Sequence, residues 1–140
     1  MKLKQRLNRV LLVDDDEATN YIHSIIINQA ECSKEVDTVM NGFEALDYLG
    51  TKKNGEYPRP EFIFLDINMP GMDGWQFLEE YGKLPEEQRG DNVIVLLTTS
   101  LNPEEHEKAK KIEIIEGFQD KPLSVEKVHQ LMRVYFPENI

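Results

Sequence analysis

Three uninterrupted apolar runs stand out along the chain, at residues 10–13, 62–65 and 93–97. A short apolar run without alternating polar residues is typical of a strand that is buried on both faces of a parallel sheet. Two weaker segments, 34–39 and 117–120, mix apolar with polar residues and fit strands at the edges of a sheet. The pattern therefore predicts three central strands and two edge strands.

The segments that follow these strands carry helical patterns. Apolar side chains recur at a helical spacing in residues 17–30, at Ala18, Ile22, Ile25 and Ile26. The other predicted helices have capping or breaking residues at their ends, and they cover 43–49, 75–81, a stretch that begins at 103, and 125–135. Each predicted strand is thus followed by a predicted helix.

Five strand-then-helix units predict an α/β fold, in which a five-stranded parallel sheet with right-handed crossovers lies between two layers of helices. The strand order 2-1-3-4-5 of flavodoxin-like folds puts the three apolar runs in the middle of the sheet. We therefore expect a three-layer α/β/α sandwich. The polar stretch 51–60 contains two prolines and one glycine and is expected to form an exposed loop.

The composition fits a single domain that spans residues 1–140. A formal net charge of −10 argues against a general nucleic-acid binder, which needs a basic surface for phosphates. Cys32 is the single cysteine, which argues against a disulfide framework or a thiolate metal cluster. The basic residues in 1–9 precede only four apolar residues, too few for a signal peptide, and no run has transmembrane length. We expect a cytoplasmic protein with no membrane contact.

Carboxylates directly follow two of the central strands. Asp14 and Asp15 follow the first strand, and Asp66 follows the third. In the order 2-1-3-4-5 these strands are neighbours, so their ends lie roughly 5 Å apart at the carboxyl edge of the sheet, where ligands bind. Asp16 leaves open whether the acidic pair is Asp14 with Asp15 or Asp15 with Asp16, although the preceding Val13 favours the first pairing.

Three carboxylates at one sheet edge repel each other and call for a positive partner. Oxygen ligands without a Cys or His cluster favour Mg²⁺, and Lys121 at the end of the fifth strand can supply an ammonium group. Thr98, at the end of the fourth strand, adds a hydroxyl donor. These groups fit phosphoryl chemistry in which Asp66 is the nucleophile and forms an aspartyl phosphate. Lys121 and Thr98 would bind the other phosphoryl oxygens.

Four motifs follow one another along nearly the whole chain. They read Leu-Val-Asp-Asp at 12–15, Leu-Asp-Ile-Asn-Met-Pro-Gly-Met-Asp-Gly at 65–74, Leu-Thr-Thr-Ser at 97–100 and Asp-Lys-Pro-Leu at 120–123. Together they make the chain resemble a receiver domain of two-component response regulators, of the stand-alone, chemotaxis-regulator-like kind.

The resemblance implies that Asp66 is the phosphoacceptor. It also implies a Mg²⁺ ion bound directly by Asp15 and Asp66, largely through water by Asp14, and by the backbone carbonyl of Asn68. Asn68 and Ser100 occupy positions that influence the lifetime of the phosphoryl group in this family.

The resemblance also assigns the two remaining groups of the site. Thr98 would be the switch hydroxyl, and Lys121 would pair with the phosphoryl group. Phe118 stands where many receivers have a Tyr, and it has no hydroxyl to hydrogen-bond with Thr98. A switch role and a plain packing role for Phe118 both stay open.

The expected function is that of a phosphorylation switch that catalyses only its own phosphorylation and dephosphorylation. A histidine kinase or a phosphotransfer protein would donate the phosphoryl group in a Mg²⁺-dependent reaction. Because the chain ends at Ile140, we expect no DNA-binding output domain. Output would then go through protein contacts, on the face formed by the helix from 103, the strand 117–120 and the helix 125–135. The motifs do not specify the kinase, the output partner or the oligomeric state.

Two other functions fit parts of this pattern. An Asp-nucleophile phosphatase usually carries a second Asp two residues after the nucleophile as acid and base, but Asn68 stands there. A receiver-like binding module that is never phosphorylated would not need the acids, Thr98 and Lys121, all of which are present. The phosphorylation switch is therefore preferred.

Overall fold

The computed structural model describes residues 3–89, 92–99 and 102–140, so that Ser100 lies outside the described residues. Its five strands form one parallel sheet in the order β2-β1-β3-β4-β5, which confirms the predicted order. The strands are β1 (Leu7–Val13), β2 (Ser33–Val39), β3 (Phe62–Leu65), β4 (Val93–Thr98) and β5 (Ile115–Asp120).

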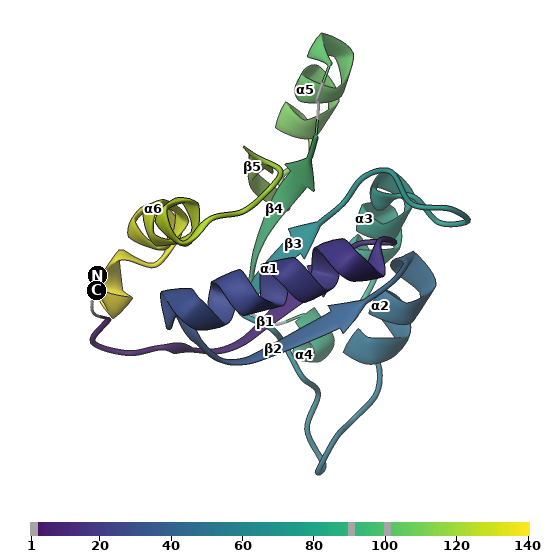
Figure 1. Ribbon diagram of the computed structural model, residues 1–140. Coiled ribbons are helices and arrows are strands. Elements are labelled where there is room, and N and C mark those ends of the chain that lie inside the picture. Colours follow the sequence, from purple (N-terminus) through teal and green to yellow (C-terminus); the bar gives the residue numbers. More distant parts are fainter. Residues whose placement is uncertain (1–2, 90–91, 100–101) are drawn as a thin grey trace.

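Helices cover both faces of the sheet (Figure 1). α1 and α6 contact each other, as do α2 and α3, which gives the expected α/β/α sandwich. The short helix α4 was not predicted from the sequence. The helices are α1 (Glu17–Ala30), α2 (Gly42–Leu49), α3 (Gly74–Gly82), α4 (Glu86–Arg89), α5 (Pro103–Lys110) and α6 (Val125–Tyr135), and a 3-10 turn, η1, follows at Pro137–Asn139.

The three central strands are buried on both faces, as their unbroken apolar runs predict. Along β3, Ile63 and Leu65 belong to the core cluster on one side of the sheet, whereas Phe62 and Phe64 belong to the cluster on the other side. The first cluster is completed from α2 and α3 and the second from α1 and α6. Because side chains alternate between the faces of a strand, an unbroken apolar run fills both core layers.

Helix α1 forms where its apolar spacing predicts, but a different face of it is buried. Its fully buried side chains include Asn20, His23 and Ile27, whereas Ile22 and Ile25 are 52% and 39% exposed. Residues 20, 23 and 27 share one helix face because they are three and four positions apart. The sheet side of α1 therefore carries two polar side chains, and part of its apolar side is left in solvent.

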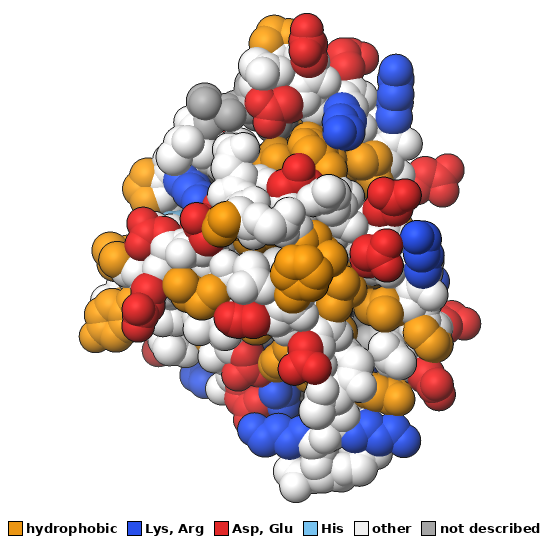
Figure 2. Space-filling view, turned by 90° about the vertical axis from the view of Figure 1, so that its right-hand side faces the viewer, with side chains coloured by type: hydrophobic (Ala, Val, Ile, Leu, Met, Phe, Trp, Pro, Cys, Tyr) orange, Lys and Arg blue, Asp and Glu red, His pale blue; other side chains and the backbone are white. Residues whose placement is uncertain are grey.

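The surface reflects the acidic composition. Figure 2 shows the face at the right-hand side of Figure 1, where acidic side chains surround several exposed apolar ones. Such a distribution is what a net charge of −10 leads us to expect. Within the described residues, no helix combines the length and the apolar character that are needed to cross a lipid bilayer.

The loop after β3 is fixed by the start of α3. Asp73 caps this helix by accepting from the Gln76 N–H at 2.9 Å, and the Gln76 side chain accepts from the Asp73 N–H at 3.0 Å. At the first helical residue, a Cβ added to Gly74 would lie 2.7 Å from the Ile67 Cα and 2.9 Å from the Asp66 carbonyl oxygen. The loop can close over the end of β3 only because Gly74 has no side chain.

We expect Gly74→Ala to lower the free energy of unfolding by about 1–3 kcal/mol, the usual range for overpacking, because the added methyl group meets backbone atoms that cannot swing away. Urea denaturation measures this change. Gly82→Ala is the matched control, since no atom lies within 4 Å of its added Cβ. Equal stability of the two variants would contradict the close approach of α3 to the end of β3.

Candidate functional site

The ends of β1, β3 and β4 bring three buried polar residues to the carboxyl edge of the sheet. Asp14 follows β1, Asp66 follows β3, Thr98 ends β4, and all three are at least 95% buried. The β1–β3 ladder continues through the Asp66 N–H, which donates to the Val13 carbonyl at 2.9 Å. This bond places the Asp14 and Asp66 side chains beside each other, as the predicted strand order requires.

The acidic cluster consists of Asp14, Asp15 and Asp66. One carboxylate oxygen from each residue lies within 4.8 Å of the other two. Asp16 has a different place: its side chain caps α1 by accepting from the Ala18 N–H at 3.0 Å and from the Thr19 N–H at 3.4 Å. In the structure, Asp15 therefore shares the cluster with Asp14 rather than with Asp16.

Lys121 is the cation inside this cluster. Its Nζ lies 2.6 Å from Asp14 Oδ2 and 3.6 Å from Asp66 Oδ2, and its side chain is only 15% exposed. The Lys121 N–H donates to the Thr98 carbonyl at 2.8 Å, so β4 fixes the backbone at this point. A buried ion pair with this geometry ties the end of β5 to the end of β1.

The environment of Asp66 disfavours its charged form. Burial raises the pKa of Asp66 to about 6, and the charges of Asp14 and Asp15 act in the same direction. The Lys121 ammonium group and the Asn68 N–H, which donates to Asp66 Oδ1 at 3.2 Å, lower this pKa again in part. A further positive charge near Asp66 would therefore favour its ionised, nucleophilic form.

The donor set of the cluster fits a hard divalent cation. It offers three carboxylates, and the backbone of Asn68 lies beside Asp66, as the 3.2 Å hydrogen bond from its N–H demonstrates. Oxygen ligands of this kind suit Mg²⁺, which takes one or two carboxylates and keeps several waters. The fold thus brings together the three carboxylates that were expected to bind Mg²⁺.

Two polar residues of α1 support the site and were missed in the sequence. The Asn20 side-chain amide donates to the Asp14 carbonyl at 2.9 Å and to the Val39 carbonyl at 3.2 Å. His23 Nε2 accepts from the Leu123 N–H at 3.3 Å. Asn20 and His23 stand three positions apart, in phase with the buried Ile27. This spacing could have identified the buried face of α1 from the sequence. The isoleucines on the other face indicated a different buried side.

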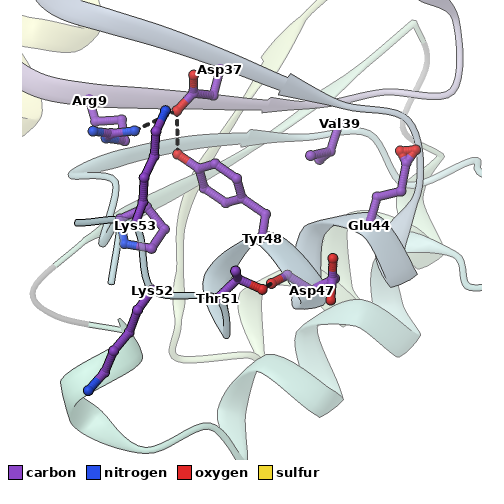
Figure 3. A pocket seen from close by; sticks show the side chains of 10 residues that line it. Arg9, Asp37, Val39, Glu44, Asp47, Tyr48, Thr51, Lys52 and Lys53 are labelled. Atoms are coloured by element: carbon purple, nitrogen blue, oxygen red, sulfur yellow. Dashed lines mark hydrogen bonds and ion pairs between the residues drawn. The ribbon is translucent and has the colours of Figure 1, made fainter. Parts of the chain in front are cut away.

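A separate cavity of about 490 Å³ lies between α2, β2 and the loop that precedes β3 (Figure 3). On one wall the Arg9 guanidinium pairs with Asp37, and the Tyr48 hydroxyl donates to the same carboxylate (Figure 3). Outside this wall, Arg9 also pairs with Glu35. Burial raises the pKa of Tyr48, so its hydroxyl stays protonated. These contacts tie α2 to the edge of the sheet, and no residue of the acidic cluster lines the cavity.

Comparison with known proteins agrees with this geometry. Residues 10–133 match the family described as response regulator receiver domain. The chain is 32% identical over 99 residues to the response regulator Rcp1 of Synechocystis sp., a match that covers 69% of this chain and 65% of that protein. It is 28% identical over 132 residues to the hybrid signal transduction histidine kinase L of Dictyostelium discoideum, covering 92% of this chain but 7% of that protein.

The chain matches less than two thirds of the length of each of these two curated relatives. Among solved structures, a two component response regulator from Cytophaga hutchinsonii superposes with a TM-score of 0.78 at 26% identity, and the match covers 93% of this chain and 97% of that one. The sheet order and the helical layers are therefore shared over nearly the full length.

The buried position of Asp66 predicts a pH-dependent effect of Asp66→Asn on stability without metal. The folded chain holds a proton on Asp66 up to about pH 6, whereas an unfolded Asp ionises near 3.8. The wild type therefore loses stability as the pH rises from about 4 to 6, and the Asn variant does not. At pH 7.5 we expect the variant to be more stable by about 2–3 kcal/mol, at about 1.4 kcal/mol per pKa unit.

Urea denaturation of both proteins in EDTA, at a series of pH values from 4 to 7.5, measures this difference. Asp16→Asn serves as the control, because the hydrogen bond from the Thr19 hydroxyl lowers the pKa of Asp16 and the effect of that variant on stability has the opposite sign. A stability gain of Asp66→Asn that is the same at all pH values would contradict the raised pKa.

Proposed function

The chain belongs to the response regulator receiver domain family, and on this premise we propose that it is a phosphorylation switch whose Asp66 accepts a phosphoryl group in a Mg²⁺-dependent reaction. The donor is a histidine kinase or a phosphotransfer protein. The observation that carries the proposal is the buried Asp66 carboxylate, which lies within 4.8 Å of two further carboxylates and 3.6 Å from the Lys121 ammonium group.

In the proposed reaction, a carboxylate oxygen of Asp66 attacks the phosphorus atom of a phosphohistidine. A C–O–P acyl phosphate bond forms and the N–P bond of the donor breaks, while the imidazole leaves with the electron pair and is protonated by water. When bound by Asp14, Asp15, Asp66 and the Asn68 carbonyl, Mg²⁺ supplies positive charge for the phosphoryl oxygens.

Lys121 and Thr98 complete the proposed reaction site. The Lys121 ammonium group, now 2.6 Å from Asp14, would exchange this partner for an oxygen of the phosphoryl group on Asp66. The buried Thr98 hydroxyl would donate to another phosphoryl oxygen. Hydrolysis of the acyl phosphate, in which water replaces Asp66 on phosphorus, returns the switch to its starting state.

The chain as a whole is proposed to act as one cytoplasmic receiver domain that catalyses only its own phosphorylation and dephosphorylation. Signalling then depends on protein contacts of the phosphorylated form, for which the face of α5, β5 and α6 remains our prediction. Helix α5 suits such a role, because Ala109 is its one buried residue among those whose burial is described. An element with so few buried contacts can shift at low energetic cost.

Incubation with acetyl phosphate and Mg²⁺, followed by intact-mass spectrometry, tests the phosphoacceptor proposal. We expect the wild type to gain the mass of one phosphoryl group, EDTA to abolish this gain, and Asp66→Asn to show none. Asp16→Asn is the matched control and should still be phosphorylated, because its carboxylate caps α1. A wild type that gains no mass with Mg²⁺ would instead favour a binding module that is never phosphorylated.

The exposed face of α1 is our proposed docking surface for the phosphodonor. Tyr21, Ile22 and Ile25 are 67%, 52% and 39% exposed and lie one to two turns after the acidic residues at the end of β1. Clustered apolar side chains in solvent mark protein contact sites. A helical donor that covers this face would bring its phosphohistidine over Asp66.

We expect the double substitution Ile22→Ser and Ile25→Ser to slow transfer from a phosphorylated histidine phosphotransfer domain by at least about fivefold, since a truncated central contact costs about 1 kcal/mol or more. The rate is measured by gel analysis of samples quenched at a series of times, with a donor domain that phosphorylates the wild type. Phosphorylation by acetyl phosphate should not change. Val134→Ser is the control, because Val134 is an exposed apolar residue of α6, 66% exposed and outside the proposed docking surface. If the double variant is phosphorylated equally slowly by the phosphotransfer domain and by acetyl phosphate, the substitutions act on the phosphorylation site and not on docking.

A further inference from the structure

His23 is a buried histidine that the proposed reaction does not use. His23 is only 2% exposed and lies on the side of α1 that faces the sheet. Its Nε2 accepts the Leu123 N–H at 3.3 Å, a contact between residues 100 positions apart in the chain. The hydrogen bond therefore joins α1 to the segment that connects β5 with α6.

This segment begins with Lys121. Pro122 has no N–H, so the Leu123 amide is the first main-chain donor after that of Lys121 itself. The Lys121 N–H is bound by the Thr98 carbonyl at 2.8 Å. The backbone that carries the lysine is thus held by β4 on one side and by His23 on the other.

The partner of Lys121 is held by the same helix. Asn20, one turn before His23, binds the Asp14 carbonyl at 2.9 Å through its side-chain amide. Asp14 Oδ2 lies 2.6 Å from the Lys121 Nζ. The two buried polar side chains of α1 therefore fix the backbones on both sides of this ion pair.

The protonation of His23 suits its part as an acceptor. Burial lowers the pKa of His23, and the Lys121 charge lowers it further, whereas the Asp14 charge raises it in part. A neutral imidazole has one unprotonated nitrogen, and here Nε2 is the atom that faces the Leu123 N–H.

We propose that His23 is a positioning residue, which through the Leu123 N–H holds the Lys121 ammonium group between Asp14 and the phosphoacceptor Asp66. For its catalytic consequence the proposal rests on the proposed function. In the proposed reaction, the Lys121 ammonium group leaves Asp14 and binds a phosphoryl oxygen. The hydrogen bonds of the Lys121 and Leu123 N–H groups keep the backbone in place, so that only the side chain rotates.

Two substitutions separate the hydrogen bond from the bulk of the side chain. His23→Gln can place an amide oxygen near the position of Nε2, whereas His23→Leu has a similar volume and no acceptor. His129→Leu is the matched control, because His129 Nε2 contacts the Ala30 carbonyl, at the end of α1 that is remote from the acidic cluster. His129→Leu removes another, partly buried link between α1 and α6.

The first readout is the NMR signal of the Lys121 ¹³Cε in metal-free protein, assigned by its loss in Lys121→Arg. We expect wild type, His23→Gln and His129→Leu to share one signal position, and His23→Leu to shift it toward that of a solvated lysine. An unmoved signal in His23→Leu overturns the proposal. Because this readout needs no phosphorylation, it decides on His23 even if Asp66 accepts no phosphoryl group.

The second readout is the rate of phosphorylation by acetyl phosphate at saturating Mg²⁺. In His23→Leu we expect a fall of roughly tenfold to a hundredfold, as for a catalytic group displaced by about an ångström, and recovery in His23→Gln. In the Lys121→Arg background, His23→Leu should cause little further loss, since both changes act through the same ammonium group. Equal losses in both backgrounds overturn the proposal and indicate a general structural role.

A measurement on the unaltered protein covers the case in which His23→Leu does not fold. The imidazole ¹⁵N spectrum distinguishes the protonated from the unprotonated nitrogen of His23. We expect Nε2 to be unprotonated and the Leu123 amide to be protected from hydrogen exchange. A proton on Nε2 would overturn the proposal, because that nitrogen could not then accept from Leu123.

Discussion

The site of this structure depends on one electrostatic constraint: three carboxylates are held close together at the carboxyl edge of the sheet. Asp14, Asp15 and Asp66 lie together because the β1–β3 ladder aligns the strands from which they come. Their repulsion is opposed by the two apolar core clusters, which bury both faces of the same strands. Lys121 offsets part of the repulsion through Asp14. The site therefore keeps an excess of negative charge, which a bound cation would offset in the phosphorylation reaction that we propose.

In the proposed function, an exchange of ion-pair partners by Lys121 would connect this constraint to signalling. Lys121 Nζ lies 2.6 Å from Asp14 and 3.6 Å from Asp66, so a phosphoryl group on Asp66 would compete for an ammonium group that is already near it. The lysine backbone is bonded to the end of β4, and β4 leads into the weakly buried α5. Figure 1 shows α5 projecting away from the sheet at that point. In the proposed switch, a change of partner at Lys121 would therefore act next to a helix with few buried residues.

Helix α1 combines two tasks on opposite faces. Its buried face contains the polar residues Asn20 and His23, which bind backbone groups at the strand ends and in the segment after β5. Buried polar groups are as a rule hydrogen-bonded, and the Asn20 amide nitrogen and His23 Nε2 each have a main-chain partner. The opposite face exposes the apolar Tyr21, Ile22 and Ile25, which a partner can cover.

The sequence by itself determined the fold and the edge of the sheet at which the carboxylates gather, but left open whether Asp14 or Asp16 pairs with Asp15. Unbroken apolar runs require strands buried on both faces, and this requirement places 10–13, 62–65 and 93–97 in the middle of a parallel sheet. The polar residues that end these strands must then share one edge. This reasoning used the local pattern together with the strand order of flavodoxin-like folds, and the structure does place Asp14, Asp66 and Lys121 close together.

Only the tertiary structure decided which face of α1 is buried and what Asp16 and His23 do. The helical period identifies a face but not its orientation when isoleucines occupy both sides, and packing against the sheet selected the face with Asn20 and His23. Asp16 became a helix cap because the chain turns into α1 at that residue. The link from His23 to Leu123 joins residues 100 positions apart, and no local pattern encodes a hydrogen bond that exists only after the strands are aligned.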